Sequence, residues 1–337
     1  MRITFQDLLQ DVELVTAAGL ERVVTGLHYD SRQIQPGYIF VCIQGYRTDG
    51  HLFIQDALSR GAVGLVIEKD IDVPSGIAFA RVNSSRLALA LMAANFYDHP
   101  SRDLTLIGVT GTNGKTTTTH LIEAVLSDKG EFTGIIGTIW NKIGEQKLPV
   151  VRTTPESLDL QSILAKMKAS MVKTVAMEVS SHALTLQRVA ACEFDVGVFT
   201  NITQDHLDFH TDLDEYLAAK MLLFDGLGKE RTKQRPCYAV VNIDDRAVHQ
   251  IEKCTRVPVI TYGIHEQADV RADQVQLTPE GSSFTVVHSE GEFPVNVSLP
   301  GEFNVYNCLA AISVGLQEKV PVPFIQDALQ KMKGVPG

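Results

Sequence analysis

The stretch GVTGTNGKTTTTH, residues 108–120, has the residue types and spacing that hold phosphate groups in proteins. Glycines allow a backbone to wrap around phosphates with its N–H groups. Lys115 is placed to reach the terminal phosphates, and the Thr116 hydroxyl to bind Mg²⁺. We therefore expect a nucleotide site that includes Gly111, Thr112, Asn113, Gly114, Lys115, Thr116 and Thr117.

The loop departs from the generic phosphate-binding pattern at one position. Val109 stands where that pattern has glycine or alanine, and the glycines fall at 108, 111 and 114 instead. The alternative is a glycine-rich turn before a capped helix, with no ligand. The Lys-Thr pair at a helix start, directly after an apolar strand, favours phosphate binding.

Two further residues with metal-binding side chains follow apolar segments. Glu178 lies at the carboxyl end of the segment TVAMEV, and ligands of open α/β sheets lie at the carboxyl ends of strands. A carboxylate there can hold Mg²⁺ directly or through water. His206 follows the next apolar segment, within FTNITQDHLDFH. Taken alone, Glu178 could be a solvated acid and His206 a core or surface histidine.

Lys220 interrupts the apolar face of an expected helix. Leu213, Tyr216, Leu217 and Phe224 fall on one face of LDEYLAAKMLLF, and Lys220 falls in the middle of it. The lysine either extends its ammonium group to solvent or is desolvated there. A desolvated lysine loses its proton readily and becomes nucleophilic.

The elements that must position these residues alternate between strand and helix. Expected strands at 104–109, 174–179, 195–200 and 238–242 are separated by helical patterns at 118–130, 156–168 and 214–228. This alternation predicts an α/β fold with a mostly parallel sheet covered by helices on both faces. Residues 282–299 read as a hairpin and 303–317 as a helix.

The beginning of the chain predicts a separate, smaller α/β domain. Short strands are expected at 38–43 and 62–68, with a helix at 53–61 between them, and a capped helix at 83–97 is expected to open the next domain. We therefore predict a substrate-binding domain at 1–84 and a P-loop-type domain at 85–333. Residues 334–337, Gly-Val-Pro-Gly, are typical of a linker.

Composition excludes several function classes. The formal net charge of −10 gives no general attraction for nucleic acid or anionic membranes. No apolar run reaches the roughly 18 residues of a membrane span, and the acidic start is unlike an export signal. Five scattered cysteines without a C-x-x-C pair indicate a reduced, cytoplasmic protein.

The segment GVTGTNGKTTT resembles the phosphate loop of the Mur ligase family of ATP-dependent amide-forming enzymes. The resemblance extends to NxTxDHLDxH around His206 and to LPGEFNVYN, where Asn304 and Asn307 match ATP-side positions or only bond to neighbouring backbone. It implies ATP and Mg²⁺ as cofactors and a CO₂-derived carbamate on Lys220. It also implies that Lys115, Glu178, His206 and Lys220 are catalytic, and that Mg²⁺ is held by Thr116, Glu178, His206 and Lys220.

Within this family, YDSRQIQPGYIFVCIQGYRTDGHLFI is similar to the uridine-nucleotide entrance of the UDP-N-acetylmuramoyl-tripeptide synthetases. VVRTTPES and SSHALTLQRV are similar to their peptide-contacting segments. The alternatives are a polar turn and simple helix capping. The resemblance implies substrate contacts at Ser31, Arg32, Gly45, Tyr46, Arg47, Thr48, Thr153, Thr154, Ser180 and Arg188.

The implied reaction is amide formation in peptidoglycan precursor synthesis. ATP would phosphorylate the free side-chain carboxylate of UDP-N-acetylmuramoyl-L-alanyl-D-glutamate, and meso-diaminopimelate or L-lysine would displace the phosphate. The family's third domain is expected after residue 337, so this chain is expected to bind ligands and turn over poorly. A folylpolyglutamate-type or cyanophycin-type ligase and a non-catalytic nucleotide-binding module are the alternatives.

Overall fold

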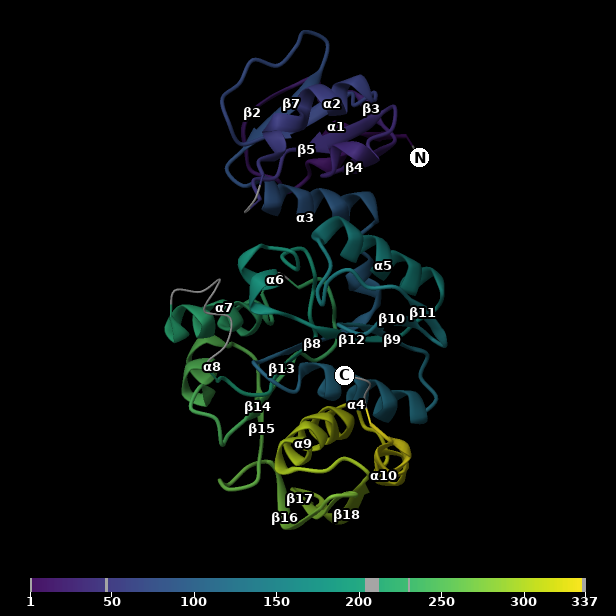
Figure 1. Cartoon of the computed structure of the whole chain (residues 1–337), viewed down its shortest axis with the longest axis vertical. Coiled ribbons are helices and arrows are strands. Elements are labelled where there is room, and N and C mark those ends of the chain that lie inside the picture. Colours follow the sequence, from purple (N-terminus) through teal and green to yellow (C-terminus); the bar gives the residue numbers. More distant parts are fainter. Residues whose placement is uncertain (1, 46–47, 204–211, 230, 335–337) are drawn as a thin grey trace. The chain divides into compact units, whose positions relative to one another are not determined.

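The computed structural model describes residues 2–45, 48–203, 212–229 and 231–334 (Figure 1). Two compact units are distinguished by packing. Unit 1 comprises residues 1–100, 155–165 and 186–192, and unit 2 the residues 101–154, 166–185 and 193–337. Because these units interleave along the chain, they do not test a boundary drawn at residue 84, which stays a prediction. No described helix is long and apolar enough to cross a membrane.

Unit 1 contains a sheet of five described strands. Strands β4 to β7 run parallel, and β2 pairs with β7 in the antiparallel sense. The strand order is β2 (Leu14–Ala18), β7 (Ala78–Val82), β6 (Gly64–Ile67), β5 (Tyr38–Val41), β4 (Gly26–His28), and β1 (Ile3–Thr4) pairs separately with β3 (Val23–Val24). The helices are α1 (Phe5–Leu8), η1 (Ser31–Gln33), η2 (Gly50–Phe53), α2 (Ile54–Ser59) and α3 (Ser85–Phe96).

Alternating side chains of β5 build the two cores of unit 1. Ile39 and Val41 pack in the core that includes residues of α1 and α3, whereas Phe40 packs in the core that includes residues of α2. A strand with apolar side chains on both faces must be covered on both. The Ser84 hydroxyl accepts the Leu87 N–H and caps α3, which confirms the predicted helix start.

Unit 2 contains a larger sheet of eleven described strands. Its order is β11 (Gln146–Leu148), β10 (Asn141–Ile143), β9 (Thr133–Ile136), β12 (Thr174–Glu178), β8 (Thr105–Thr110), β13 (Val196–Phe199), β14 (Tyr238–Asn242), β15 (Val259–Gly263), β16 (Val270–Thr278), β17 (Gly281–His288), β18 (Gly291–Val297). Strands β9, β12, β8 and β13 to β16 run parallel, and antiparallel hairpins close both edges. This arrangement confirms the predicted α/β class and the predicted hairpin.

Helices cover both faces of this sheet. On one face α4, α9 and α10 share a continuous core with β8, β13, β17 and β18 (Figure 1). On the other face the rings of Phe224 in α7 and Phe199 in β13 meet edge to face with centroids 6.2 Å apart. The helices of unit 2 are α4 (Lys115–Asp128), α6 (Ser181–Thr185), α7 (Leu213–Gly226), α8 (Val248–Cys254), α9 (Glu302–Gln317) and α10 (Val322–Lys331). The residues of η3 (Pro100–Asp103) and α5 (Ser157–Ala169) are divided between the two units.

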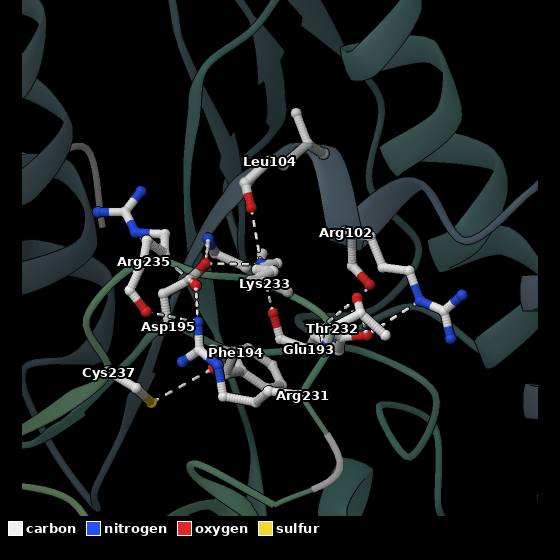
Figure 2. Close-up of polar contacts among 12 residues, drawn as sticks. Arg102, Leu104, Glu193, Phe194, Asp195, Arg231, Thr232, Lys233, Arg235 and Cys237 are labelled. Carbon is white, nitrogen blue, oxygen red and sulfur yellow. Dashed lines mark hydrogen bonds and ion pairs between the residues drawn. The ribbon is translucent and has the colours of Figure 1, made fainter.

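A buried ion cluster fastens the segment before β14 to the amino ends of the central strands (Figure 2). Asp195, fully buried just before β13, pairs with Arg231 at 2.8 Å and with Lys233 at 2.6 Å. The Lys233 ammonium also donates to the carbonyl oxygens of Leu104 and Glu193, both at 2.8 Å. Burial lowers the pKa of Lys233, while Asp195 opposes the shift.

Candidate nucleotide-binding and catalytic site

The loop between β8 and α4 takes a conformation that requires glycine at two positions. Gly111 has φ +146° and Gly114, which precedes the first residue of α4, has φ +83°. A Cβ atom on Gly111 would lie 1.9 Å from the Thr200 Oγ1, and one on Gly114 would lie 2.3 Å from the Asn307 Oδ1. Glycine is therefore needed at both positions, because the backbone conformation and the neighbouring side chains leave no room for a Cβ atom.

Two lysine ammonium groups bond to this loop. Lys115 Nζ donates to the carbonyl oxygens of Gly111 (2.9 Å) and Thr112 (2.7 Å). Lys220 Nζ donates to the same Gly111 oxygen at 2.7 Å and lies 4.2 Å from the centroid of the Tyr216 ring. Lys220 is only 1% exposed, so its ammonium group does not extend to solvent. The loop thus has two positive charges beside it, which suits an anionic ligand.

Glu178 ends β12, the parallel neighbour of β8, and its carboxylate is buried beside the first turn of α4. The Thr116 hydroxyl donates to its Oε2 at 2.9 Å. Thr138 donates its N–H to Oε1 at 2.8 Å and its hydroxyl to Oε2 at 3.1 Å. These bonds compensate for burying the charge. A Cβ on Gly137 would lie 2.4 Å from Oε1, so glycine is needed for this close approach.

A carboxylate beside a threonine hydroxyl is a donor set that suits Mg²⁺, which prefers few protein oxygens and several waters. The pair of Thr116 and Glu178 therefore fits the metal that the sequence predicts. Among the described residues no group of three or more His, Cys, Asp or Glu side chains is placed to hold a metal. His206 lies outside the described residues.

The segment after β13 supports the phosphate loop through hydrogen bonds that sequence analysis did not predict. The Thr112 N–H donates to the backbone carbonyl oxygen of Asn201 at 2.8 Å. The Asn113 N–H donates to the side-chain oxygen of Asn201 at 3.0 Å. The Thr200 hydroxyl donates to the Asn113 carbonyl at 2.7 Å. The signal that was available is the polar pair Thr200-Asn201 directly after the apolar strand.

Asn304 and Asn307 lie on α9 and connect that helix to the loop. The Thr118 hydroxyl donates to the Asn307 side-chain oxygen at 3.2 Å, and the Asn307 amide donates to Asn304 at 3.1 Å. Asn304 in turn donates to the Pro300 carbonyl at 2.9 Å, so the expected bond to neighbouring backbone is present. Asn307 lies against Gly114, and Thr117 is partly buried in the first turn of α4.

Three of the predicted substrate residues gather near Glu178 in unit 2. The Thr154 hydroxyl donates to the Glu178 carbonyl at 2.9 Å and accepts the Ser180 N–H at 3.2 Å. The Thr153 and Thr138 hydroxyl oxygens lie 3.1 Å apart, and because Thr138 donates its hydrogen to Glu178, Thr153 is the donor of this pair. Strands β9 and β12 run parallel, so their carboxyl ends lie at the same edge of the sheet. Thr138 follows β9 and Ser180 follows β12, and both therefore lie at this edge.

The other described substrate residues belong to unit 1. Ser31 and Arg32 follow β4, and Gly45 and Thr48 follow β5, its parallel neighbour, so both segments leave the same edge of the sheet. Arg32 is 79% exposed and pairs with Asp30 at 2.7 Å. Arg188 is largely buried and pairs with Glu156 at 2.9 Å. Tyr46 and Arg47 lie outside the described residues.

Comparison with known proteins shows the family to which the chain belongs. Residues 109–315 match the Mur ligase middle domain, and residues 23–97 match the domain described as Mur ligase family, catalytic domain. The chain belongs to the Mur ligase family.

Among relatives of this Mur ligase chain, the UDP-N-acetylmuramoyl-L-alanyl-D-glutamate–2,6-diaminopimelate ligase of Bacillus velezensis is 46% identical over 93% of the chain. The chain spans 64% of that relative's length. The ligase of the same name from Listeria monocytogenes is 41% identical over 98% of the chain, which spans 67% of it.

Solved structures agree with the fold of this Mur ligase chain. A UDP-N-acetylmuramoyl-L-alanyl-D-glutamate–2,6-diaminopimelate ligase has a TM-score of 0.87 at 28% identity, covering 100% of the chain and 68% of that structure. The UDP-N-acetylmuramoylalanyl-D-glutamyl-2,6-diaminopimelate–D-alanyl-D-alanyl ligase from Acinetobacter baumannii has a TM-score of 0.69 at 22% identity, covering 99% of the chain and 70% of that structure. The second likeness concerns the fold alone.

Proposed function

We propose that this Mur ligase chain carries the ATP-binding and substrate-binding residues of an ATP-dependent ligase of peptidoglycan precursor synthesis. The ligase adds the third amino acid to UDP-N-acetylmuramoyl-L-alanyl-D-glutamate through an acyl phosphate, in the cytoplasm. The observation that carries the proposal is the bond between the Thr116 hydroxyl and the buried Glu178 carboxylate, at the start of the helix that follows a glycine loop. The names of the 41–46% identical relatives support it.

In this mechanism the protein acts by positioning and charge neutralisation, because phosphoryl transfer needs little covalent chemistry from the enzyme. Lys115 exchanges its bonds to the Gly111 and Thr112 carbonyls for oxygens of the terminal phosphates. The N–H groups of the loop and the N-terminus of α4 bind the remaining phosphate oxygens. Thr116, Glu178 and His206 would hold Mg²⁺, which would supply positive charge beside the transferring phosphoryl group.

Lys220 completes this proposal as the site of a carbamate. The ammonium group would lose one proton to water, and the resulting amine would form an N–C bond to CO₂ and release a second proton to water, which leaves an anionic carbamate able to bind Mg²⁺. The position of Lys220 supports this, because its Nζ is buried and bonds to the Gly111 carbonyl of the phosphate loop, beside the proposed phosphate site. Mass spectrometry in bicarbonate, with Lys220→Met as control, would detect the 44 Da adduct expected from adding CO₂.

The proposed ligands follow from the two sets of substrate residues. The uridine nucleotide is assigned to the unit 1 loops after β4 and β5, with the residues Ser31, Arg32, Gly45, Tyr46, Arg47 and Thr48. Arginine and hydroxyl groups bind a diphosphate locally in an otherwise acidic protein. The dipeptide is assigned to Thr153, Thr154, Ser180 and Arg188. The amino acid, meso-diaminopimelate or L-lysine, is the second substrate.

Calorimetry with Mg²⁺ and a non-hydrolysable ATP analogue tests the proposal. The titrated ligands are UDP-N-acetylmuramoyl-L-alanine, UDP-N-acetylmuramoyl-L-alanyl-D-glutamate and a dihydropteroate. Selective binding of the dipeptide ligand is expected. Preference for dihydropteroate would replace the proposal by a folylpolyglutamate-type ligase, and binding of the ATP analogue alone would favour a nucleotide-binding module.

A further inference from the structure

Two rings with unused hydrogen-bonding groups lie beside the proposed magnesium site. His120 is on α4, one turn after Thr116, and Trp140 immediately precedes β10. Their ring centroids are 5.7 Å apart, edge to face. The His120 Nε2 and Trp140 Nε1 atoms are buried, and neither has a hydrogen-bond partner among the residues described. Buried polar atoms of this kind are rare in folded proteins and call for an explanation.

The tautomer of His120 follows from its other nitrogen. Nδ1 lies 2.8 Å from the carbonyl oxygen of Thr116, and a carbonyl oxygen only accepts, so Nδ1 carries the hydrogen. In the neutral ring Nε2 is then an acceptor, whereas Trp140 Nε1 is a donor. The two unused groups are therefore chemically complementary.

The Trp140 ring has a second contact, and its residue lies close in the chain to the proposed magnesium site. Lys147 of β11 places its Nζ 3.8 Å from the centroid of the indole, a cation–π contact. Only Ile139 separates Trp140 from Thr138, which donates two hydrogen bonds to Glu178. The position of the indole thus bears directly on the loop that holds the carboxylate.

These contacts form a closed ring of residues. The Thr116 hydroxyl bonds to Glu178, Glu178 to Thr138, Thr138 continues along the chain to Trp140, Trp140 contacts His120, and His120 bonds back to the Thr116 carbonyl. We name these five residues the circuit: Thr116, His120, Thr138, Trp140 and Glu178.

We propose that Trp140 and His120 are positioning residues, which hold the Glu178 carboxylate and the Thr116 hydroxyl at the separation that Mg²⁺ binding requires. The proposal rests on the proposed function, in which Thr116 and Glu178 bind the metal. Partners that orient metal ligands in this way commonly contribute ten- to hundredfold to metal affinity. Neither ring touches the nucleotide in this proposal, so their effect should depend on the metal.

The test is calorimetry of a non-hydrolysable ATP analogue, with Mg²⁺ and separately with EDTA. Trp140→Leu should weaken binding about tenfold with Mg²⁺ and leave binding in EDTA unchanged. Trp140→Phe keeps a ring against His120 and should restore most of the affinity. Phe132→Leu is the matched control, an aromatic residue 45% exposed next to β9 and outside the circuit, and should change neither value.

Unchanged affinity in Trp140→Leu, or an equal loss with and without Mg²⁺, would overturn the inference. If Trp140→Leu does not fold, His120→Asn decides by the same criteria, since asparagine keeps an N–H donor for the Thr116 carbonyl and removes the ring. The double variant Thr138→Ala/Trp140→Leu should lose little more than Thr138→Ala alone, whereas additive losses contradict action through Thr138.

The same experiment separates failure of the inference from failure of the proposed function. Glu178→Gln should abolish the difference between Mg²⁺ and EDTA, because it removes the proposed metal ligand itself. A wild-type protein that binds the analogue equally well with and without Mg²⁺ would refute the metal site and the circuit's role together. A Mg²⁺ dependence lost in Glu178→Gln but intact in Trp140→Leu and His120→Asn would refute only the inference.

Discussion

At the scale of single residues, few residue types fit the positions of the phosphate loop. Gly111 and Gly114 combine positive φ with contacts that leave no room for a Cβ atom. Thr116 bonds to Glu178, a residue 62 positions away in the chain. Each side chain near the loop is therefore constrained by a neighbour from another strand or helix, and substitutions there should have local and measurable effects.

Gly114→Ala should destabilise the protein by more than the about 1–3 kcal/mol that a side chain in a strained backbone conformation costs, because the added Cβ would also lie 2.3 Å from Asn307 Oδ1. It should also weaken nucleotide binding, because the new methyl group meets Asn307 Oδ1 beside the loop. Gly130→Ala is the matched control, since Gly130 has φ +93° and nothing within 4 Å of the added Cβ. Urea unfolding measures the free energy of unfolding of the two variants. Equal losses of stability in Gly114→Ala and Gly130→Ala would show that the close approach to Asn307 is unimportant.

At the scale of elements, the central sheet is held from both ends of its strands. At the carboxyl ends, the segments after β8, β12 and β13 bond to one another around the loop. At the amino ends, Asp195 and the segment 231–235 form the buried ion cluster of Figure 2. Neighbouring strands are thus joined by side-chain contacts in addition to the hydrogen bonds between strands. The contacts at the carboxyl ends and at the amino ends of the strands can be tested by separate substitutions.

Asp195→Asn should destabilise the protein by about 3–5 kcal/mol, because it leaves the cations of Arg231 and Lys233 without their buried partner. The control is Asp225→Asn, which breaks the more exposed pair with Lys229 and should cost about 0.3–0.5 kcal/mol. Chemical denaturation gives both values. Nearly equal small losses would mean that water solvates the cluster.

Asp244 gives a prediction about pH. Burial acts to raise its pKa, but N–H groups of Ile264, His265 and Glu266 and the Tyr306 hydroxyl all donate to the carboxylate and lower the pKa overall. A carboxyl group with a lowered pKa stabilises the fold above its unfolded value near 3.8, and this contribution is lost as pH falls through the folded pKa.

Asp244→Asn should therefore be less stable than the wild type by about 1–3 kcal/mol at pH 7, the cost of disrupting hydrogen bonds to a charged group. The difference should shrink below the unfolded pKa, as the wild-type carboxyl becomes protonated. Urea unfolding at pH 7 and pH 3 measures it. A difference that stays constant with pH would show that charge is not the cause.

At the scale of the whole molecule, the proposed ligands divide between the two units. The phosphate loop, Glu178 and Lys220 all belong to unit 2, whereas the loops assigned to the uridine nucleotide belong to unit 1. The residues described around the phosphate loop complete their hydrogen bonds within unit 2 alone. The contacts proposed for ATP and for the uridine nucleotide should therefore be separable in the same molecule, whereas Thr153, Thr154 and Ser180, proposed for the dipeptide of the UDP-sugar, belong to unit 2 as well.

Hydrogen exchange should resolve this division. The ATP analogue with Mg²⁺ should slow exchange at residues 111–117 and at Thr138, because a ligand that binds the native state suppresses local opening. The UDP-sugar dipeptide should slow exchange at residues 31–33 and in the loop after β5. Protection by the ATP analogue that is confined to unit 1 would contradict the assignment.

Much of the fold was predictable because its signals are local. The loop between β8 and α4, the capped helix α3 and the hairpin of β17 and β18 each lie within one short stretch of sequence. Strand β9 was missed because Thr-Gly-Ile-Ile is short and interrupted by glycine. Thr138, which follows it, was missed as well, since one threonine after a strand carries no signal without its partner Glu178.

The sequence alone determined the chemistry available to this Mur ligase chain: a glycine loop with Lys115 and Thr116, an acid at a strand end, and a lysine on an apolar helix face. Only the tertiary structure decided which of these groups meet. The order β9, β12, β8, β13 does not follow the chain, yet it brings Thr138, Glu178, Thr116 and Thr200 to one edge of the sheet. Strand order depends on long-range packing, which hydrophobic periodicity does not encode.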